Sequence, residues 1–139
     1  MSRRDDLHFP LRNALEKDGW IITDDPLLLT FEGLPLQADI GAERTFAARK
    51  GNEKIAVEVK DFDSRSTTND LQRMMGQLQL YQWALDDEEP DRTLFLAICF
   101  SIYDRHFLKP AFQAVVKRNK INLIIFDEIE EVILQWIKA

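Results

Sequence analysis

Cysteine and histidine are scarce in this chain. Cys99 is the only cysteine among 139 residues, so an internal disulfide and a thiolate metal cage are both excluded. The two histidines, His8 and His106, are too distant in the sequence to form a histidine-rich zinc motif. Zinc and disulfide chemistry therefore lack the residues that they require.

Long apolar runs are also missing. The longest run spans Leu94 to Phe100, seven residues, whereas a membrane-spanning helix needs about 20. Arg3 and Arg4 stand near the start, but Asp5 and Asp6 follow them, and no apolar stretch of signal-peptide length comes next. We therefore expect a cytoplasmic protein without a membrane segment.

Glycine is rare, with five residues, and none of them forms a glycine-rich phosphate-binding loop. A Gly-x-Ser-x-Gly elbow is likewise missing. These two absences argue against a nucleotide-binding loop and against a serine-hydrolase triad.

Basic residues are outnumbered by acidic ones, and the formal net charge is −6. The stretches Asp86 to Asp91 and Asp127 to Glu131 hold nine of the 24 acids and no Lys or Arg. The rest of the chain therefore has 15 acids against 18 basic residues, an excess of three positive charges. Nucleic-acid contact is compatible with this distribution, although the total charge does not indicate it.

The hydrophobic pattern predicts one α/β domain over residues 1–139, with a mixed sheet covered by helices. The expected helices are Asp6 to Asp18, about Asn69 to Leu85, and a region around Pro110 to Asn119. The expected strands are Trp20 to Thr23, Leu27 to Phe31, Leu36 to Ala42, Phe46 to Ala48, Lys54 to Lys60, Thr93 to Phe100, Asn122 to Asp127 and Val132 to Ile137. Pro10 fits if it lies in the first helical turn, and Thr68 or Asn69 is the expected cap of the second helix.

The main candidate for chemistry is a set of three charged residues on two predicted strands. Side chains alternate along a strand, so Glu58 and Lys60 share one face, which we expect to look toward a cleft, while the flanking valines face the core. Asp39 interrupts the apolar segment of the preceding hairpin strand. Two neighbouring carboxylates form a hard oxygen site suited to Mg²⁺ or Mn²⁺, and a nearby lysine can assist phosphodiester hydrolysis.

Ordinary surface charge is the alternative, because a Glu-x-Lys tripeptide arises by chance in about every second chain of this length. Two observations favour a site. This is the only Asp/Glu-x-Lys sequence in the chain, and it ends a predicted apolar strand.

Three further residues are candidates for the same site. Gln77 and Tyr81 are four residues apart and share a helical face, although a solvated Gln77 and a core Tyr81 are the structural alternatives. His8 lies near the start of the first helix, where it can approach a metal or phosphate or simply cap the helix.

Several separated segments resemble the XisH family. They are Ala38-Asp39-Ile40-Gly41-Ala42-Glu43-Arg44, Lys54-Ile55-Ala56-Val57-Glu58-Val59-Lys60-Asp61-Phe62 and Gly76-Gln77-Leu78-Gln79-Leu80-Tyr81. His8 with Asn13 to Trp20 resembles the family's opening segment, and Ile125-Phe126-Asp127 with Gln135-Trp136-Ile137 resembles its end. The resemblance covers nearly the whole chain.

XisH proteins are described as fdxN element excision controlling factors of cyanobacteria, acting with a companion factor, XisI, and a site-specific recombinase. Their fold is similar to restriction-endonuclease-like, PD-(D/E)XK domains. The resemblance implies that Asp39, Glu58 and Lys60 are the catalytic set, that Asp39 and Glu58 hold the metal, and that His8 and Gln77 contribute. Ala38 stands where that pattern has its proline.

Two functions follow from the resemblance. The first is a Mg²⁺- or Mn²⁺-dependent DNA endonuclease that helps excise or control a DNA element. The second is a regulatory partner that keeps the nuclease fold and binds XisI, the recombinase or DNA without cutting. The sequence leaves the oligomeric state open, with a homodimer among the alternatives.

Overall fold

A computed structural model describes residues 3–36, 45–62 and 66–139, with side chains from Leu7 onward within these ranges. The helices are α1 (Arg3–Lys17), α2 (Thr67–Glu88), α3 (Phe100–Ile102) and α4 (Pro110–Arg118), with a π-helical segment η1 (Tyr103–Phe107) following α3. The strands are β1 (Ile21–Asp24), β2 (Leu29–Phe31), β3 (Leu34–Leu36), β4 (Thr45–Lys50), β5 (Glu53–Val59), β6 (Arg92–Cys99), β7 (Asn122–Asp127) and β8 (Val132–Ile137).

Six of the strands form a mixed sheet in the order β1-β4-β5-β6-β7-β8. β4 and β5 form an antiparallel hairpin, β5, β6 and β7 run parallel, and β8 returns antiparallel to β7. The parallel neighbours are joined by long crossovers that contain α2, and α3 through α4, as parallel pairing requires. β2 and β3 form a separate two-stranded sheet that packs against α2. The predicted α/β class and mixed sheet are confirmed.

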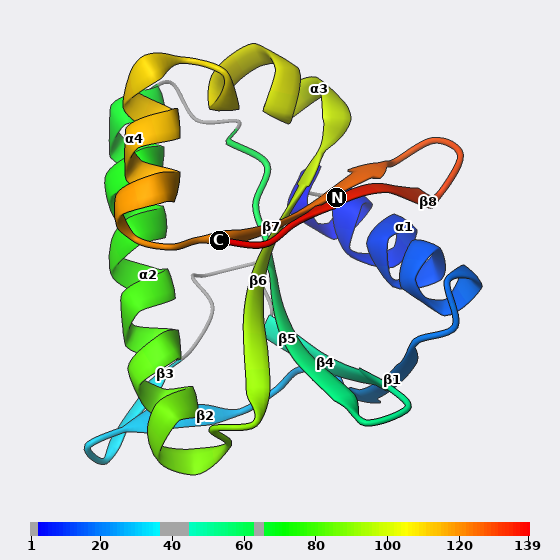
Figure 1. Ribbon diagram of the computed structural model, residues 1–139, viewed down its shortest axis with the longest axis vertical. Coiled ribbons are helices and arrows are strands. Elements are labelled where there is room, and N and C mark those ends of the chain that lie inside the picture. The colour runs from blue at the N-terminus through cyan, green and yellow to red at the C-terminus, as the bar shows by residue number, and fades with distance from the viewer. Residues whose placement is uncertain (1–2, 37–44, 63–65) are drawn as a thin grey trace.

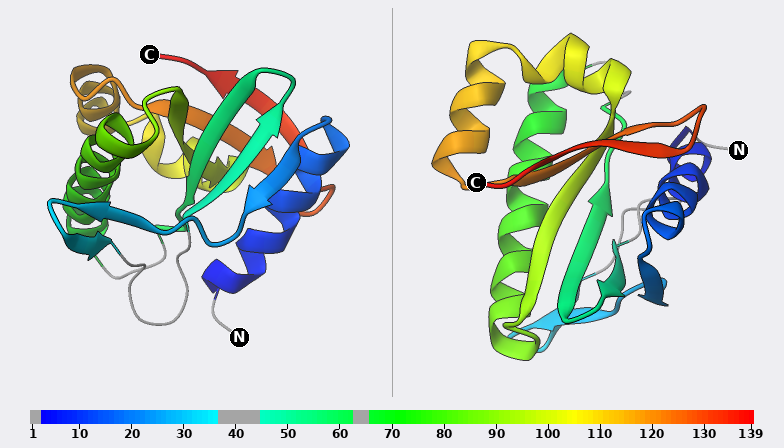
Figure 2. Two further views of the ribbon diagram at one scale, coloured as in Figure 1. Left: turned by 90° about the horizontal axis from the view of Figure 1, so that it is seen from below. Right: turned by 45° about the vertical axis from the view of Figure 1, so that its right-hand side comes forward.

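Helices cover both faces of the six-stranded sheet. α1 lies on one face, and α2 and α4 lie on the other (Figures 1 and 2). The central strands are therefore buried on both sides, and every residue of β6 from Leu94 to Cys99 is buried. This arrangement explains the continuous apolar run in the sequence, because a strand covered on both faces does not alternate between apolar and polar residues.

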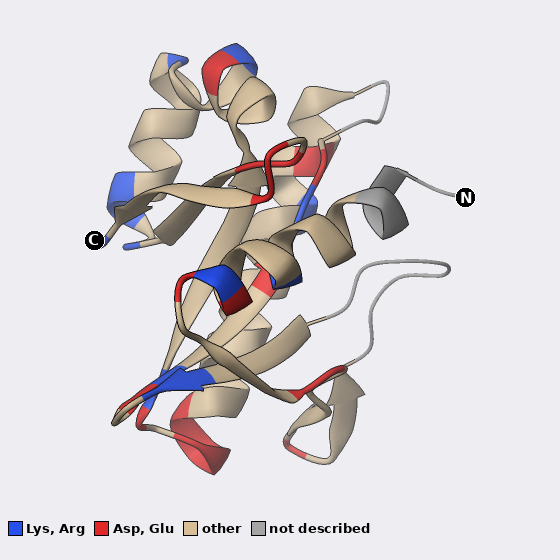
Figure 3. Cartoon of the chain, turned by 90° about the vertical axis from the view of Figure 1, so that its right-hand side faces the viewer, with Lys and Arg blue, Asp and Glu red and all other residues tan. Residues whose placement is uncertain are grey.

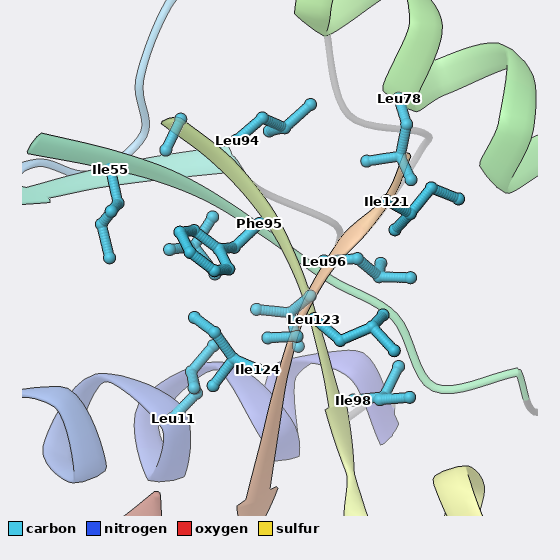
Figure 4. Packing of buried hydrophobic residues seen from close by; sticks show 14 of the residues in the cluster. Leu11, Ile55, Leu78, Leu94, Phe95, Leu96, Ile98, Ile121, Leu123 and Ile124 are labelled. Atoms are coloured by element: carbon cyan, nitrogen blue, oxygen red, sulfur yellow. The ribbon is translucent and has the colours of Figure 1, made fainter. Parts of the chain in front are cut away.

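The core has two layers separated by the sheet. Leu78 of α2 points toward Leu96 and Ile121 on one side, whereas Leu11 of α1 lies near Ile124 on the other (Figure 4). Leu11 and Ile124 have no exposed surface. A core on both faces fixes the register of β5, because a slip by one residue would exchange its two buried faces.

Three local predictions require correction. Helix α1 begins at Arg3, so Pro10 lies in the middle of the helix and not in its first turn. Ser66 caps α2 by accepting a hydrogen bond from the Asn69 N–H at 3.1 Å, in place of Thr68 or Asn69. The segment Phe100 to Phe107 is helical, so the predicted strand Thr93 to Phe100 ends at Cys99, and His106 lies in η1.

The last two strands have the predicted bounds, Asn122–Asp127 and Val132–Ile137. The predicted strand Leu36 to Ala42 is described only at its start, because residues 37–44 lie outside the described ranges. Among the helices that the structure describes, none has the length and apolarity needed to span a bilayer.

Candidate functional site

Glu58 lies near the end of β5 and has no exposed surface. Its neighbours Val57 and Val59 are also buried, at 0% and 4% exposure, so both faces of β5 are covered. Glu58 is therefore not exposed on an open face of the sheet, because helices cover the sheet on both sides. A cleft that Glu58 shares with Asp39 stays a prediction, because Asp39 lies outside the described residues. Burying a carboxylate costs free energy unless hydrogen-bond donors surround it, so Glu58 requires such donors in its surroundings.

Thr45 supplies one such partner from the neighbouring strand. The β4–β5 register places Thr45 directly opposite Glu58, and the Thr45 hydroxyl donates to Glu58 Oε2 at 2.6 Å. Thr45 is itself buried, with 5% exposure. The hydrogen bond therefore fixes the orientation of the Glu58 carboxylate at the end of the hairpin.

Lys60 directly follows β5 and is buried, with 5% exposure. Its backbone N–H donates to the Ala97 carbonyl at 3.1 Å, which extends the ladder to β6 by one residue. Strand alternation then places the Lys60 side chain on the same face as Glu58. Its ammonium group donates to the side-chain oxygen of Gln77 on α2.

The helical stripe of α2 positions Gln77 for this contact. Met74, Leu78 and Leu85 point into the core, with exposures of 0%, 7% and 0%, while half-buried Gln77 reaches the end of β5. The prediction that Gln77 diverges from this core stripe toward the candidate site is confirmed. Tyr81 is 5% exposed and belongs to the core cluster, as its structural alternative predicted.

His8 lies on α1 and is buried, with 3% exposure. Its Nε2 is 2.8 Å from Asp25 Oδ2, and Arg12 donates to the same oxygen at 2.7 Å. The His8 ring also contacts Phe46, with centroids 5.5 Å apart. Phe46 follows Thr45 in β4, so alternation places Phe46 and His8 on the sheet face opposite the Thr45–Glu58 pair. A direct role for His8 in the chemistry stays a prediction.

Asp39, the second predicted carboxylate, lies outside the described residues. Within residues 3–36, 45–62 and 66–139, no group of three His, Cys, Asp or Glu side chains is arranged to hold a metal ion. Mg²⁺ commonly binds through one or two carboxylates together with water and substrate phosphates, so a cage made entirely by the protein is not required. Glu58 and Asp39 stay the two predicted oxygen ligands.

Thr45 and Asp25 were not among the predicted site residues, although each lies next to or within a turn that the sequence indicates. Gly51 has φ +60° within the turn between Lys50 and Glu53, and a two-residue turn there sets the hairpin register that places Thr45 opposite Glu58. Asp25 stands in an Asp-Asp-Pro turn, which indicated a turn but not a partner for His8.

His106 is a further buried titratable group, with 9% exposure, near the carboxyl ends of the parallel strands. Its ring lies against Phe112 and Phe62, with centroids 6.1 and 6.5 Å apart. Burial lowers the pKa of His106 below its ordinary value, and the positive charges of Lys109 and Arg105 lower this pKa further, while Asp70 opposes them. The neutral imidazole is therefore favoured in the folded protein.

Comparison with known proteins identifies the family. The family model described as XisH protein matches residues 1–134. The chain belongs to the XisH family. No curated protein matches it.

Two solved structures share the fold. An XisH family protein from Nostoc punctiforme PCC 73102 is 36% identical, with a TM-score of 0.88 over 96% of this chain and all of the other. An fdxN element excision controlling factor protein from Anabaena variabilis is 37% identical, with a TM-score of 0.88 over 97% of this chain and all of the other. The chain thus belongs with the fdxN element excision controlling factors, and the XisH resemblance seen in its motifs is confirmed.

Proposed function

We propose that this XisH family chain is a divalent-metal-dependent DNA endonuclease with a restriction-endonuclease-like fold, which acts in excising or controlling a DNA element. The observation that carries the proposal is the burial and fixed orientation of two charged residues, Glu58 and Lys60, at the end of β5. Glu58 is fully buried and oriented by Thr45, and Lys60 two residues later is buried against Gln77. Burying two charged groups is expensive, and strongly placed charges of this kind are typical of functional sites.

The chain's own residues have separate tasks in this proposal. Glu58 and Asp39 hold Mg²⁺ or Mn²⁺, which when bound lowers the pKa of a water and neutralises charge on the scissile phosphate. Thr45 orients Glu58. Lys60 directs its ammonium group at the attacking water or the developing negative charge, and Gln77 limits where that group can move.

His8 lies on the opposite face of the sheet from Glu58, with its ring held by Asp25, so the proposal assigns it no step at the metal or the phosphate.

The proposal is tested by incubating the purified protein with supercoiled, linear and branched DNA, with and without Mg²⁺ or Mn²⁺. We expect metal-dependent nicking or cleavage by the wild type and its loss in Glu58→Gln, which keeps an acceptor for the Thr45 hydroxyl but removes the negative charge. Glu53→Gln, at the exposed start of the same strand, is the matched control and should cleave like the wild type. Cleavage by Glu58→Gln at the wild-type rate would contradict the proposal.

A regulatory partner without cleavage is the second candidate, and one observation favours it. The carboxyl end of α2 is acidic (Figure 3). It carries Asp86, Asp87 and Glu88 about one turn after Trp83, which is 45% exposed. Acids repel a DNA backbone, whereas an aromatic side chain ringed by charge is typical of a protein interface. Absence of cleavage on every DNA, together with binding of XisI or the recombinase, would favour this candidate.

A further inference from the structure

Strand β8 forms one edge of the six-stranded sheet. It is hydrogen-bonded to β7 on one side, and no other strand in the described part of the chain pairs with its outer side. An unpaired edge presents a row of backbone donors and acceptors that can add a further strand. Proteins that keep such an edge free commonly protect it with lysine, proline or a covering element.

A β-bulge, which also protects a free edge, is present at Leu134, but β8 carries exposed apolar side chains as well. Leu134 within the strand is 50% exposed, Val132 at its start is 36% exposed, and Ile129 in the preceding turn is 84% exposed. A bulge at Leu134 interrupts the ladder to β7. Main-chain pairing along this edge would therefore be short, and contacts at the two ends of the strand must contribute to any stable association.

The two ends of β8 have opposite charge. Glu130 and Glu131 precede the strand, and Lys138 follows it; acidic residues colour the turn between β7 and β8 in Figure 3. An antiparallel pairing of two β8 strands about their midpoint places Lys138 of each copy opposite Glu131 of the other. The strand is thus complementary in charge to itself when it is reversed.

The end of β8 that carries Lys138 also borders a hollow. A cavity of about 390 Å³ is lined by the apolar Trp20, Ile55, Phe95 and Trp136 and by two acids and two lysines, Asp18, Glu53, Lys50 and Lys138. The Trp136 ring packs against Trp20 and Phe95, with centroids 5.5 and 5.1 Å apart, which gives the hollow an aromatic wall. The Lys50 ammonium nitrogen lies 3.8 Å from Asp18 Oδ2, and both side chains are about half exposed.

We infer that β8 is the interface between two copies of this chain, which pair antiparallel about a two-fold axis. Each copy places its acidic turn, with the exposed Ile129, beside Lys138 at the end of β8 of the other. This contact then occurs twice, as a closed two-fold interface requires. This assembly is independent of the proposed nuclease site.

Charge reversal at the two ends of β8 tests the assembly by light scattering after size-exclusion chromatography. Lys138→Glu places an acid of one copy opposite the acids of the other, and Glu130→Lys/Glu131→Lys places lysines opposite Lys138. Like charges repel, so we expect each variant to be monomeric and the wild type to be dimeric. An equimolar mixture of the two variants restores opposite charges at both ends and should form a heterodimer. Lys117→Glu, exposed in the last turn of α4, is the matched control and should remain dimeric.

Circular dichroism of each variant establishes that it is folded before its mass is measured. A wild type that is monomeric at all concentrations would overturn the inference. Fast hydrogen exchange along β8 in that monomer would then indicate an unpaired edge that can bind a strand of another protein. Variants that remain dimeric, or a mixture of folded variants that stays monomeric, would equally overturn it.

Discussion

Lys60 illustrates how one residue combines burial with a proposed chemical task. Its side chain is 5% exposed, and its ammonium group donates to Gln77. The sequence predicted that Lys60 shares a strand face with Glu58, because alternation depends only on spacing. The sequence could not predict the burial, because burial depends on α2 covering that face.

Replacing Lys60 with methionine separates metal binding from cleavage. Lys60→Met keeps an unbranched side chain that is one heavy atom shorter, and it removes a positive charge but no metal ligand. We expect metal-induced stabilisation to persist and the DNA nicking rate to fall by about 10²-fold or more, since groups that stabilise transition-state charge contribute on this scale. The exposed Lys54, which pairs with Asp91 at 3.0 Å, provides the control variant Lys54→Met. Equal nicking rates for Lys60→Met and Lys54→Met would exclude the proposed role.

His106 should make the protein sensitive to mild acid. Burial lowers its pKa in the folded state below the unfolded value of about 6.5, so the unfolded chain binds more protons between these two pKa values. The contribution of His106 to stability is therefore smallest at low pH and rises as pH increases through that window. Urea unfolding across this range should show a weaker pH dependence for His106→Gln. An unchanged slope would mean that another group causes the acid sensitivity.

The elements of this chain differ in how far the sequence predicts them. β7 and β8 have the predicted bounds because apolar and β-branched residues stand between clear turn signals. The segment Phe100 to Phe107 was missed because Phe100 continues the apolar run of β6, and the polar residues that follow have no long helical period. Short helices of this kind are fixed by tertiary packing, here of Phe107 against Phe62 and Phe112.

The start of α2 provides an element-scale prediction. Ser66 accepts the Asn69 N–H, so Ser66→Ala should lower the free energy of unfolding by about 1 kcal/mol, whereas Thr68→Ala, within the helix, should have a smaller effect. Urea unfolding of both variants measures the difference. Equal destabilisation would favour a cap at Thr68 or Asn69.

At the scale of the whole molecule, the sequence predicted a mixed sheet covered by helices, and the structure confirms it. Burial of both sheet faces was not predicted along β5, because the alternation of charged and apolar residues there is also typical of a strand with one solvent face. Helix α1 covers one face of the sheet and α2 covers the other (Figure 1), so Glu58 is buried by elements that are distant in the sequence. Such enclosure cannot be read from a local pattern.

The central claim is that Glu58, at the end of β5, binds a divalent ion in the folded protein together with Asp39. A ligand that binds only the folded state stabilises it by about 2.7 kcal/mol at a hundred times its dissociation constant, which is a rise of several degrees in melting temperature for a chain of this size. Asp39 is the expected second ligand, so Asp39→Asn should reduce this rise as Glu58→Gln does.

The most direct test is the change in melting temperature with millimolar Mn²⁺, measured for the wild type and for Glu58→Gln. The account predicts a rise of several degrees for the wild type and little or none for Glu58→Gln, with Glu53→Gln behaving as the wild type. An equal rise in the wild type and Glu58→Gln would contradict the account, because the ion would then bind elsewhere.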